Sequence, residues 1–270
     1  MNDDKYFQTN LKRWNELVDI NAKSKSYDLE GFKSGKTSLH PIELEEVGNV
    51  KGKSLLHLQC HFGMDTLSWA RLGAHVTGVD FSDEAINLAR KLKNELNIPA
   101  KFIMSNIYEI PQVLNRKFDI VFTSYGTICW LPNLVKWAQI ISDCLKPGGI
   151  FYIIDGHPFG FLIDEKQEPF NIGFNYFPKG KPLIFEEGCA YADSSADLKN
   201  KAAYEWDHPI SEIINALINA NLELEFLHEF PYTFFNIHPD MKEREDGYWE
   251  FQTSKFTVPM MFSLRAHKKF

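Results

Sequence analysis

Polar side chains stand where short apolar runs end, and their types suit the binding of a nucleoside. The run 55–58 is followed by the segment 59–63, which reads Gln-Cys-His-Phe-Gly, and then by a helical pattern. A tight turn between a strand and a helix directs backbone N–H groups and the helix N-terminus towards a ligand, and Gly63 lets the backbone approach it closely. Asp80 follows about 20 residues later, at the end of the run 75–79. A carboxylate there can accept hydrogen bonds from both ribose hydroxyls, with helix capping as its alternative role.

A regular alternation of strands and helices positions these side chains. Short apolar runs and helical patterns alternate from Ser54 to Asp155. Because parallel neighbours need crossover helices, this rhythm predicts an α/β fold with a doubly wound, mostly parallel sheet. Ligands of such sheets bind beyond the carboxyl ends of the strands. The expected strands are 54–58, 75–79, 101–104, 118–123 and 150–154, and the expected helices are 65–72 (closed by Gly73), 82–96 (capped by Ser82) and 133–145.

The alternation stops after Asp155. The stretch from Gly156 to about Tyr204 is too long for an ordinary connection and predicts a functional insertion. A helix is expected at 211–221 and strands at 222–230 and 257–266, which form an antiparallel hairpin that finishes the sheet because no crossover helix joins them. The expected parts are an N-terminal cap (1–45), helical around 11–20, the cofactor-binding half of the core (46–156), an insertion or substrate lid (157–205) and the C-terminal part of the core (206–270).

Composition and charge exclude several classes of protein. Of 270 residues, 44% are hydrophobic and 24% charged, as is typical of a globular protein. Twenty-nine basic against 36 acidic side chains give a net charge of −7, the wrong sign for nucleic acid or an anionic membrane surface. No run of 18 apolar residues and no signal-peptide pattern occurs, so a cytoplasmic location is expected. The four cysteines show no CxxC spacing, which indicates neither a zinc site nor a disulfide framework.

Five motifs, taken in order, resemble those of class I S-adenosylmethionine-dependent methyltransferases. They are the loop 59–63, Val-Asp-Phe-Ser at 79–82, Ser-Asn-Ile at 105–107, Phe-Asp-Ile-Val at 118–121 and Leu-Lys-Pro-Gly-Gly at 145–149. Their order is more specific than any one motif. The resemblance implies a Rossmann-like sheet of seven strands, the last antiparallel, and S-adenosylmethionine as cofactor. The first motif, LHLQCHFG, resembles that of a bacterial subgroup of small-molecule type.

The resemblance also assigns cofactor-binding residues. The Asn106 side-chain carbonyl is expected to accept a hydrogen bond from the adenine amino group, and the Ile107 N–H is expected against the adenine ring. Most of the family has an acidic residue and three glycines in the first motif, but here only the last glycine remains, so the new side chains either reshape the pocket or close it. A NAD site is disfavoured because no GxGxxG opens the helix. The assigned residues are Gln59, Cys60, His61, Gly63, Asp80, Phe81, Asn106, Ile107 and Ser124.

Methyl transfer from a sulfonium requires chiefly that the acceptor be aligned and water excluded. His157 and Tyr125 are expected just past the fifth and fourth strands, where a general base for a hydroxyl or amine acceptor would stand. Loop stabilisation is the alternative role of His157, and packing against the cofactor is that of Tyr125. The segment 124–127, Ser-Tyr-Gly-Thr, lacks the Asp/Asn-Pro-Pro-Tyr/Phe pattern that grips a flipped base, and no Pro-Cys pair occurs, which disfavours a nucleic-acid substrate.

The sequence therefore predicts methyl transfer to a small, partly apolar acceptor. Nine aromatic residues between Phe151 and Phe185 suit a water-poor cavity in the insertion. The alternative is that these residues only pack on the sheet or on a second subunit of a homodimer. The rival function, motivated by the missing glycines, is a non-catalytic regulatory or scaffolding subunit related to methyltransferases.

Overall fold

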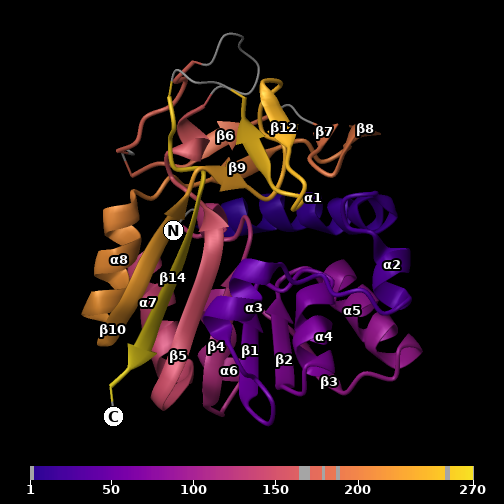
Figure 1. The fold of residues 1–270 in the computed structure, drawn as a ribbon, viewed down its shortest axis with the longest axis vertical. Helices are drawn as coiled ribbons and strands as arrows, with labels where there is room; N and C mark the ends of the chain where they lie inside the picture. The colour runs from indigo at the N-terminus through magenta and orange to yellow at the C-terminus, as the bar shows by residue number, and fades with distance from the viewer. Residues whose placement is uncertain (1–2, 164–170, 178–179, 187–188, 253–255, 270) are drawn as a thin grey trace.

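The computed structural model describes residues 3–163, 171–177, 180–186, 189–252 and 256–269 (Figure 1). Parts of the predicted insertion, at 164–170, 178–179 and 187–188, therefore lie outside the described residues. Within the described part of the chain, no helix is both long and apolar enough to cross a membrane.

A seven-stranded sheet forms the body of the molecule, in the order β10-β14-β5-β4-β1-β2-β3. β14 is antiparallel to both of its neighbours, whereas β5, β4, β1, β2 and β3 run parallel. The predicted mostly parallel sheet with its last strand antiparallel is confirmed. The strands are β1 (Ser54–Leu58), β2 (His75–Asp80), β3 (Ala100–Met104), β4 (Phe118–Ser124), β5 (Leu145–Gly156), β10 (Leu222–Phe230) and β14 (Met261–Lys268).

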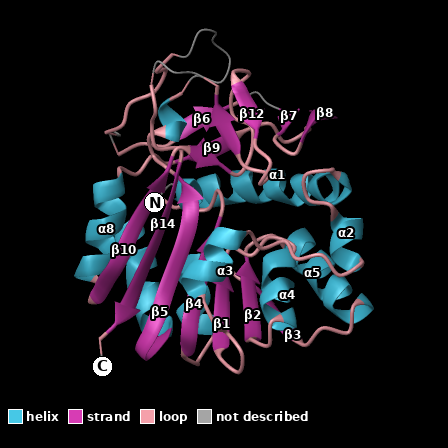
Figure 2. Cartoon of the chain, viewed as in Figure 1, coloured by secondary structure: helices cyan, strands magenta, loops and turns pink. Residues whose placement is uncertain are grey.

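Helices cover both faces of this sheet (Figure 2). Successive strand residues point to opposite faces, so Leu56 and Val121 pack with α6, α7 and α8, while Leu55 and Phe122 pack with α3 and α4. The helices are α1 (Asp3–Lys23), α2 (Leu29–Lys33), α3 (Pro41–Val47), α4 (Met64–Arg71), α5 (Asp83–Glu95), α6 (Ile110–Val113), α7 (Leu134–Cys144) and α8 (Ile210–Asn219), with 3-10 turns η1 (Ile107–Glu109), η2 (Ile128–Trp130) and η3 (Gly160–Leu162).

Most expected boundaries agree with the structure within a few residues. Ser82 caps α5 by accepting a hydrogen bond from the Ala85 N–H at 3.0 Å, and Gly73 adopts a left-handed φ of 93°, both as predicted. The last strand begins at Met261 and not at 257, because Pro259 has no N–H to donate to a ladder. The fifth strand, β5, begins at Leu145 and not at 150, and Leu145 pairs with Phe118 of β4.

A cover of small sheets and one long helix lies over the carboxyl ends of the parallel strands (Figure 1). The expected insertion supplies two of these sheets, but a third lies between β10 and β14, where only a loop was predicted. Within the cover, the Asn10 side chain joins α1 to β9 by donating to the Tyr204 carbonyl at 2.8 Å and accepting from the Tyr204 N–H at 2.9 Å. The strands of the cover are β6 (Leu183–Phe185) with β9 (Ala203–Glu205), β7 (Cys189–Ala190) with β8 (Asp193–Asp197), and β11 (Tyr232–Thr233), β13 (Trp249–Phe251) and β12 (Met241–Glu243).

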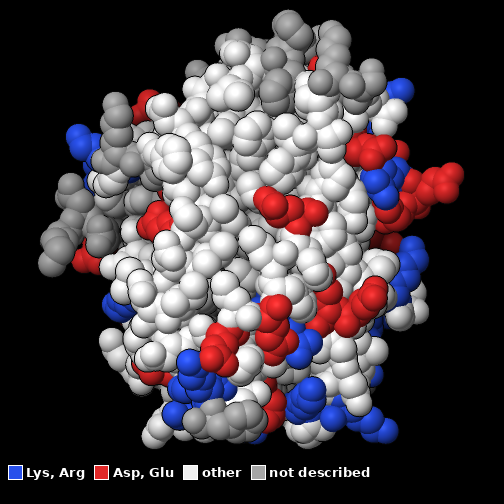
Figure 3. All heavy atoms as spheres, turned by 60° about the vertical axis from the view of Figure 1, so that its left-hand side comes forward, with Lys and Arg blue, Asp and Glu red and all other residues white. Residues whose placement is uncertain are grey.

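Charge is unevenly distributed between body and cover. On the face in Figure 3, most Lys and Arg side chains lie over the lower part, whereas the upper part has a broad uncharged area with charged side chains near its right-hand edge. Three apolar side chains of the cover, Ile172, Phe177 and Ile184, are more than half exposed.

The turn from β1 into α4 depends on Gly63. Its φ is 79°, and a Cβ at this position would lie 2.6 Å from the Phe102 ring and 3.2 Å from the Ala89 Cβ. The glycine was expected to give a ligand room, but the structure gives it a packing role against the sheet side of α5.

We predict that Gly63→Ala lowers the free energy of unfolding by about 2 to 4 kcal/mol, because it combines a left-handed Cβ with overpacking of a buried ring. Gly52→Ala is the matched control, since Gly52 has a similar φ of 75° but nothing within 4 Å of its Cβ direction. It should cost only about 1 to 2 kcal/mol in urea denaturation. Equal losses in the two variants would show that the contact with Phe102 contributes nothing.

Candidate functional site

A cavity lies at the carboxyl ends of β1, β2 and β3 and encloses about 430 Å³ of empty space, including its open mouth. Five of the predicted cofactor-binding residues line it, together with Phe7 and Asn10 of α1 and Trp130 of η2. The five predicted residues are Gln59, Asp80, Phe81, Asn106 and Ile107.

Asp80 is the buried acid of this cavity. Its Oδ2 accepts the His61 N–H at 2.8 Å and its Oδ1 accepts the Ser82 N–H at 2.9 Å. No lysine or arginine in the described part of the chain forms an ion pair with it. Burial raises the pKa of Asp80 to about 6, against the opposing effect of its backbone donors. Each carboxylate oxygen has a second lone pair, so Asp80 can still accept hydrogen bonds from a ligand.

The loop after β1 has a glycine-like backbone at two positions that carry side chains. Gln59 and His61 have φ values of 53° and 48°, in the left-handed region that residues with a Cβ seldom adopt. Cys60 between them is buried, donates its N–H to the Val79 carbonyl at 3.0 Å, and has a thiol whose pKa is raised by burial. The thiol therefore stays protonated, and its contacts are structural.

The Gln59 side chain spans from this loop to the loop after β4. Its Nε2 donates to the Thr127 carbonyl at 2.9 Å, whereas its buried Oε1 has no hydrogen-bond partner among the described residues. Thr127 is itself held by Asp155, whose Oδ2 accepts from the Thr127 N–H at 2.9 Å and from the Ile128 N–H at 3.1 Å. Asp155 was not predicted as a site residue, although an acid at the end of the fifth strand is its sequence signal.

His61 joins the loop to the cover. Its Nε2 accepts from the Asn21 side-chain amide at 3.1 Å, and the same amide donates to the Tyr191 hydroxyl at 2.8 Å. The ring packs against Trp14 and Tyr27. Burial lowers the pKa of His61 to about 3, so the imidazole is neutral and serves to hold α1 and the β7–β8 hairpin over the loop.

Asn106 and Ser124 already have partners in the protein. Asn106 Oδ1 accepts the Tyr108 N–H at 3.0 Å as the cap of η1, and its second lone pair is left for a ligand. Ser124 Oγ donates to Asp65 Oδ2 at 3.0 Å, and Ser124 is not among the residues that line the cavity.

Tyr125 forms a buried pair with Glu43, which sequence reasoning did not select. The Tyr125 hydroxyl donates to Glu43 Oε2 at 2.8 Å, and Glu43 Oε1 accepts the His40 N–H at 2.7 Å as part of the α3 capping box. The sequence signal was His40-Pro41, followed by an acid three residues after the cap. Burial, and then Glu43, raise the pKa of Tyr125, which makes its phenol a hydrogen-bond donor and disfavours the expected role as a base.

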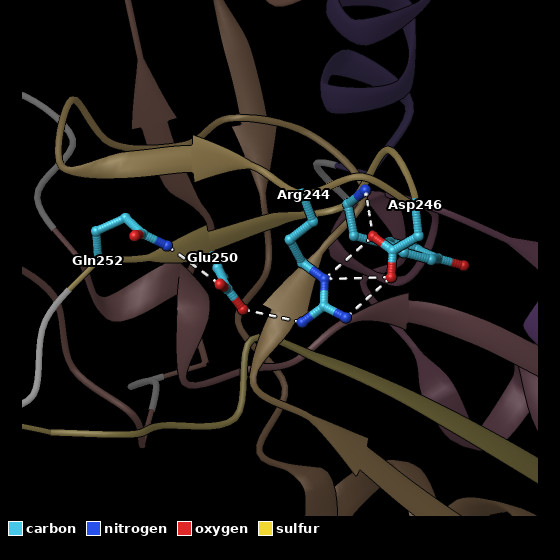
Figure 4. A network of polar contacts seen from close by, with 5 residues as sticks. Arg244, Asp246, Glu250 and Gln252 are labelled. Atoms are coloured by element: carbon cyan, nitrogen blue, oxygen red, sulfur yellow. Dashed lines mark hydrogen bonds and ion pairs between the residues drawn. The ribbon is translucent and has the colours of Figure 1, made fainter.

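A polar network holds together the small sheet β11-β13-β12, which lies between β10 and β14 in the chain (Figure 4). Arg244 Nη2 lies 2.9 Å from Asp246 Oδ2 and its Nη1 lies 2.9 Å from Glu250 Oε2, while its guanidinium stacks 4.3 Å from the centre of the Tyr232 ring. Tyr232 in turn contacts the ring of Tyr248. The network thereby joins β11 and β13 to the turn before β13, and the Tyr248 ring also contacts His40, the cap of α3.

His157 lies away from the cavity-lining residues. Its Nδ1 accepts the Phe159 N–H at 3.0 Å, its Nε2 lies 2.9 Å from Glu229 Oε1, and its N–H donates to the Met260 carbonyl at 3.0 Å. Burial lowers the pKa of His157, and Glu229 acts in the opposite direction. These contacts favour the loop-stabilising alternative, and catalysis by His157 stays a prediction.

Residues 56–153 match the protein family described as Methyltransferase domain. The likeness to this family therefore lies in the segment that contains the parallel strands. The segment contains most of β1, all of β2, β3 and β4, most of β5 and most of the residues that line the cavity.

Curated proteins similar to this chain match it over only part of their own length. A ubiquinone biosynthesis O-methyltransferase of Shewanella pealeana is 29% identical over 119 residues, which are 43% of this chain and 50% of the relative. An uncharacterized methyltransferase of Synechocystis is 32% identical over 126 residues, which are 46% of this chain and 56% of the relative. The chain thus spans about half the length of these relatives.

Solved structures extend the likeness in fold to most of the chain. An S-adenosylmethionine-dependent methyltransferase from Mesorhizobium loti superposes with a TM-score of 0.58 at 18% identity, covering 87% of this chain and 100% of the other. A putative enzyme of the same description from Listeria monocytogenes gives a TM-score of 0.59 at 16% identity, over 85% and 96%. The chain therefore has a Rossmann-like fold of the kind found in these methyltransferases.

We predict that Glu43→Gln flattens the pH dependence of stability. Burial raises the pKa of Glu43 from 4.5 to about 8, so the unfolded chain releases this proton at lower pH than the folded protein does. Its contribution is present below pH 4.5 and is lost as the pH rises towards 8. Between pH 5 and 8 the wild-type free energy of unfolding should fall by at least about 2 kcal/mol more than that of the variant, measured in urea. Parallel curves would contradict a protonated Glu43.

Proposed function

We propose that this protein is an enzyme that transfers a methyl group from S-adenosylmethionine to a small, partly apolar acceptor. The observation that carries the proposal is Asp80, a buried carboxylate without a cationic partner in the described chain, set in a cavity at the strand ends of a methyltransferase fold. A buried acid is unfavourable unless donors satisfy it, and ribose hydroxyls are suitable donors.

The residues of the cavity fit this cofactor. Asp80 would accept the ribose hydroxyls, and Asn106 and Ile107 would flank the adenine. The unpartnered Gln59 Oε1 offers a further acceptor. The cofactor supplies a methyl group activated by a sulfonium, so the tasks of the chain are to bind, to orient and to exclude water.

The acceptor is proposed to lie among aromatic side chains near the loops after β1 and β4. Trp14 contacts Trp130 at 5.3 Å between ring centres, and Tyr125 contacts Phe234 at 4.6 Å. Trp14 lies in α1 and Trp130 in η2, whereas Tyr125 directly follows β4 and Phe234 directly follows β11. Their faces would attract an aromatic or cationic acceptor by roughly 0.5 to 2 kcal/mol per contact. The names of the relatives, which include ubiquinone biosynthesis O-methyltransferases, support a small organic acceptor.

Three side chains are considered for moving a proton of the acceptor, namely Tyr125, Glu43 and His157. Tyr125 is better suited to donate a hydrogen bond to the acceptor than to remove its proton, because its phenol stays neutral. Glu43 behind it can hold a proton near neutral pH. His157 stays a predicted base, and its loss should lower turnover about 10²-fold or more if it acts as one.

We predict that calorimetry will show binding of S-adenosylhomocysteine, weakened about 10- to 100-fold by Asp80→Ala, as expected for loss of a charged acceptor. Asp143→Asn, an exposed acid of α7, is the control and should leave binding unchanged. Absence of wild-type binding at millimolar ligand would reject the enzymatic proposal.

The same binding should depend on pH through Asp80. Since burial raises the pKa of this carboxyl to about 6, protonation below that pH removes the anionic acceptor. Between pH 7.5 and 5 the wild-type affinity should decline, by up to about tenfold per unit below pH 6. Asp80→Asn should bind weakly but with a flat profile. An equally steep decline in that variant would place the titrating group elsewhere.

Restoring glycines in the loop after β1 tests the alternative that the protein is a non-catalytic regulatory or scaffolding subunit. We predict that changing both Gln59 and His61 to glycine leaves cofactor binding unchanged or weaker, because Gln59 ties the two loops together and His61 supports α1. Clearly tighter binding in the double variant would show that these side chains obstruct the pocket, which favours a regulatory or scaffolding protein.

A further inference from the structure

We propose that Gln59 Oε1 recognises the α-ammonium group of the bound cofactor and so selects ligands that retain the amino-acid part. This inference rests on the proposed function, because it takes the adenosine to lie against Asp80, Asn106 and Ile107.

The orientation of the Gln59 amide is fixed by its surroundings. Its Nε2 lies 2.9 Å from the Thr127 carbonyl, which can only accept a hydrogen bond, so the amide nitrogen must face it. Thr127 cannot easily turn away, because its N–H and its hydroxyl both donate to Asp155 Oδ2, at 2.9 and 2.8 Å. The oxygen of the amide is therefore the end that remains for a ligand.

That oxygen is buried and unsatisfied within the described structure. Buried amide oxygens nearly always have a donor, and one left without is unfavourable. Gln59 also holds a left-handed backbone conformation, with φ of 53°, and strain of this kind concentrates at sites of function. Both observations indicate that a donor belongs at this atom.

The sheet order places this atom beside the methionine part of the cofactor. Adjacent strands run β3, β2, β1 and β4. With the adenine at the β3 end and the ribose at Asp80 of β2, the rest of the ligand extends over β1 towards β4. Gln59 follows β1 and its partner Thr127 follows β4, so Gln59 Oε1 lies along this path.

The methionine part has one group that can donate a hydrogen bond. Its sulfur and its carboxylate have no hydrogen to donate, whereas its ammonium has three. A neutral amide oxygen and a cationic donor form a charge-assisted bond, which is stronger than a neutral one. No lysine or arginine is among the residues that line the cavity, so no like charge opposes the ammonium there.

The test compares two ligands on the full-length chain and on Gln59→Met, which keeps the length of the side chain but removes both polar ends. S-adenosylhomocysteine carries the ammonium, and 5′-methylthioadenosine shares its adenosine and thioether but lacks the amino-acid part. Calorimetry should show that the variant binds S-adenosylhomocysteine about 10- to 100-fold more weakly and 5′-methylthioadenosine within about threefold of wild type. Gln139→Met, an exposed glutamine of α7, should change neither affinity.

A second measurement does not depend on the variant. The side-chain amide resonances of Gln59 in the wild-type protein should shift with S-adenosylhomocysteine and much less with 5′-methylthioadenosine. If wild type binds both ligands but Gln59→Met weakens them equally, or weakens neither, the inference is overturned while the proposed function stands. If wild type binds neither ligand, the proposed function fails and this inference fails with it. Circular dichroism shows whether the Gln59→Met variant is folded. If it is unfolded, the shifts of the Gln59 amide resonances in the wild-type protein decide the question.

Discussion

The carboxylate of Asp155 fixes the loop after β4, and the geometry of the cavity depends on that interaction. It accepts hydrogen bonds from the backbone N–H groups of Thr127 and Ile128, which would otherwise be buried without partners. The Thr127 carbonyl is thereby directed at Gln59, so two loops that are distant in sequence behave as one rigid edge. A buried carboxylate is unfavourable unless such donors surround it, so the position of Asp155 and the fold of the loop depend on each other.

The loop after β1 is joined to the cover through hydrogen bonds between uncharged groups. His61 is uncharged because of its burial, and it accepts from Asn21 while Asn21 donates to Tyr191. Asn10 pairs with the backbone of Tyr204 in the same layer. An uncharged connection of this kind carries no desolvation penalty for an ion, and it links α1 to the cavity without introducing a positive charge near the place where a cationic ligand is proposed to lie.

The acids around the parallel sheet differ in their hydrogen-bond and ion-pair partners. Asp80 and Glu43 are buried with raised pKa values and with donors on some of their lone pairs, whereas Asp119, which pairs with Lys146 at the opposite end of β4, has its pKa lowered to about 2. Asp119 at the amino end of β4 is thus paired with a lysine, whereas Asp80 at the carboxyl end of β2 has no cationic partner among the described residues. This asymmetry is the electrostatic counterpart of the rule that ligands bind at the carboxyl edge.

The sequence by itself determined the sheet, the cap of α5 and the place of Asp80, because apolar periodicity and capping are local properties that a window of ten or so residues records. The sequence also indicated that Gln59 and His61 replace glycines of the first motif, but it did not indicate which residues they contact. Only the tertiary structure decided that Gly63 faces Phe102, that Glu43 holds Tyr125, that a third small sheet lies between β10 and β14, and that His157 lies beside Glu229. Three of these are side-chain contacts between residues 39 to 82 positions apart in the chain, and the small sheet is built from short strands with little periodicity. Long-range contacts are set by packing and burial, which no local pattern encodes.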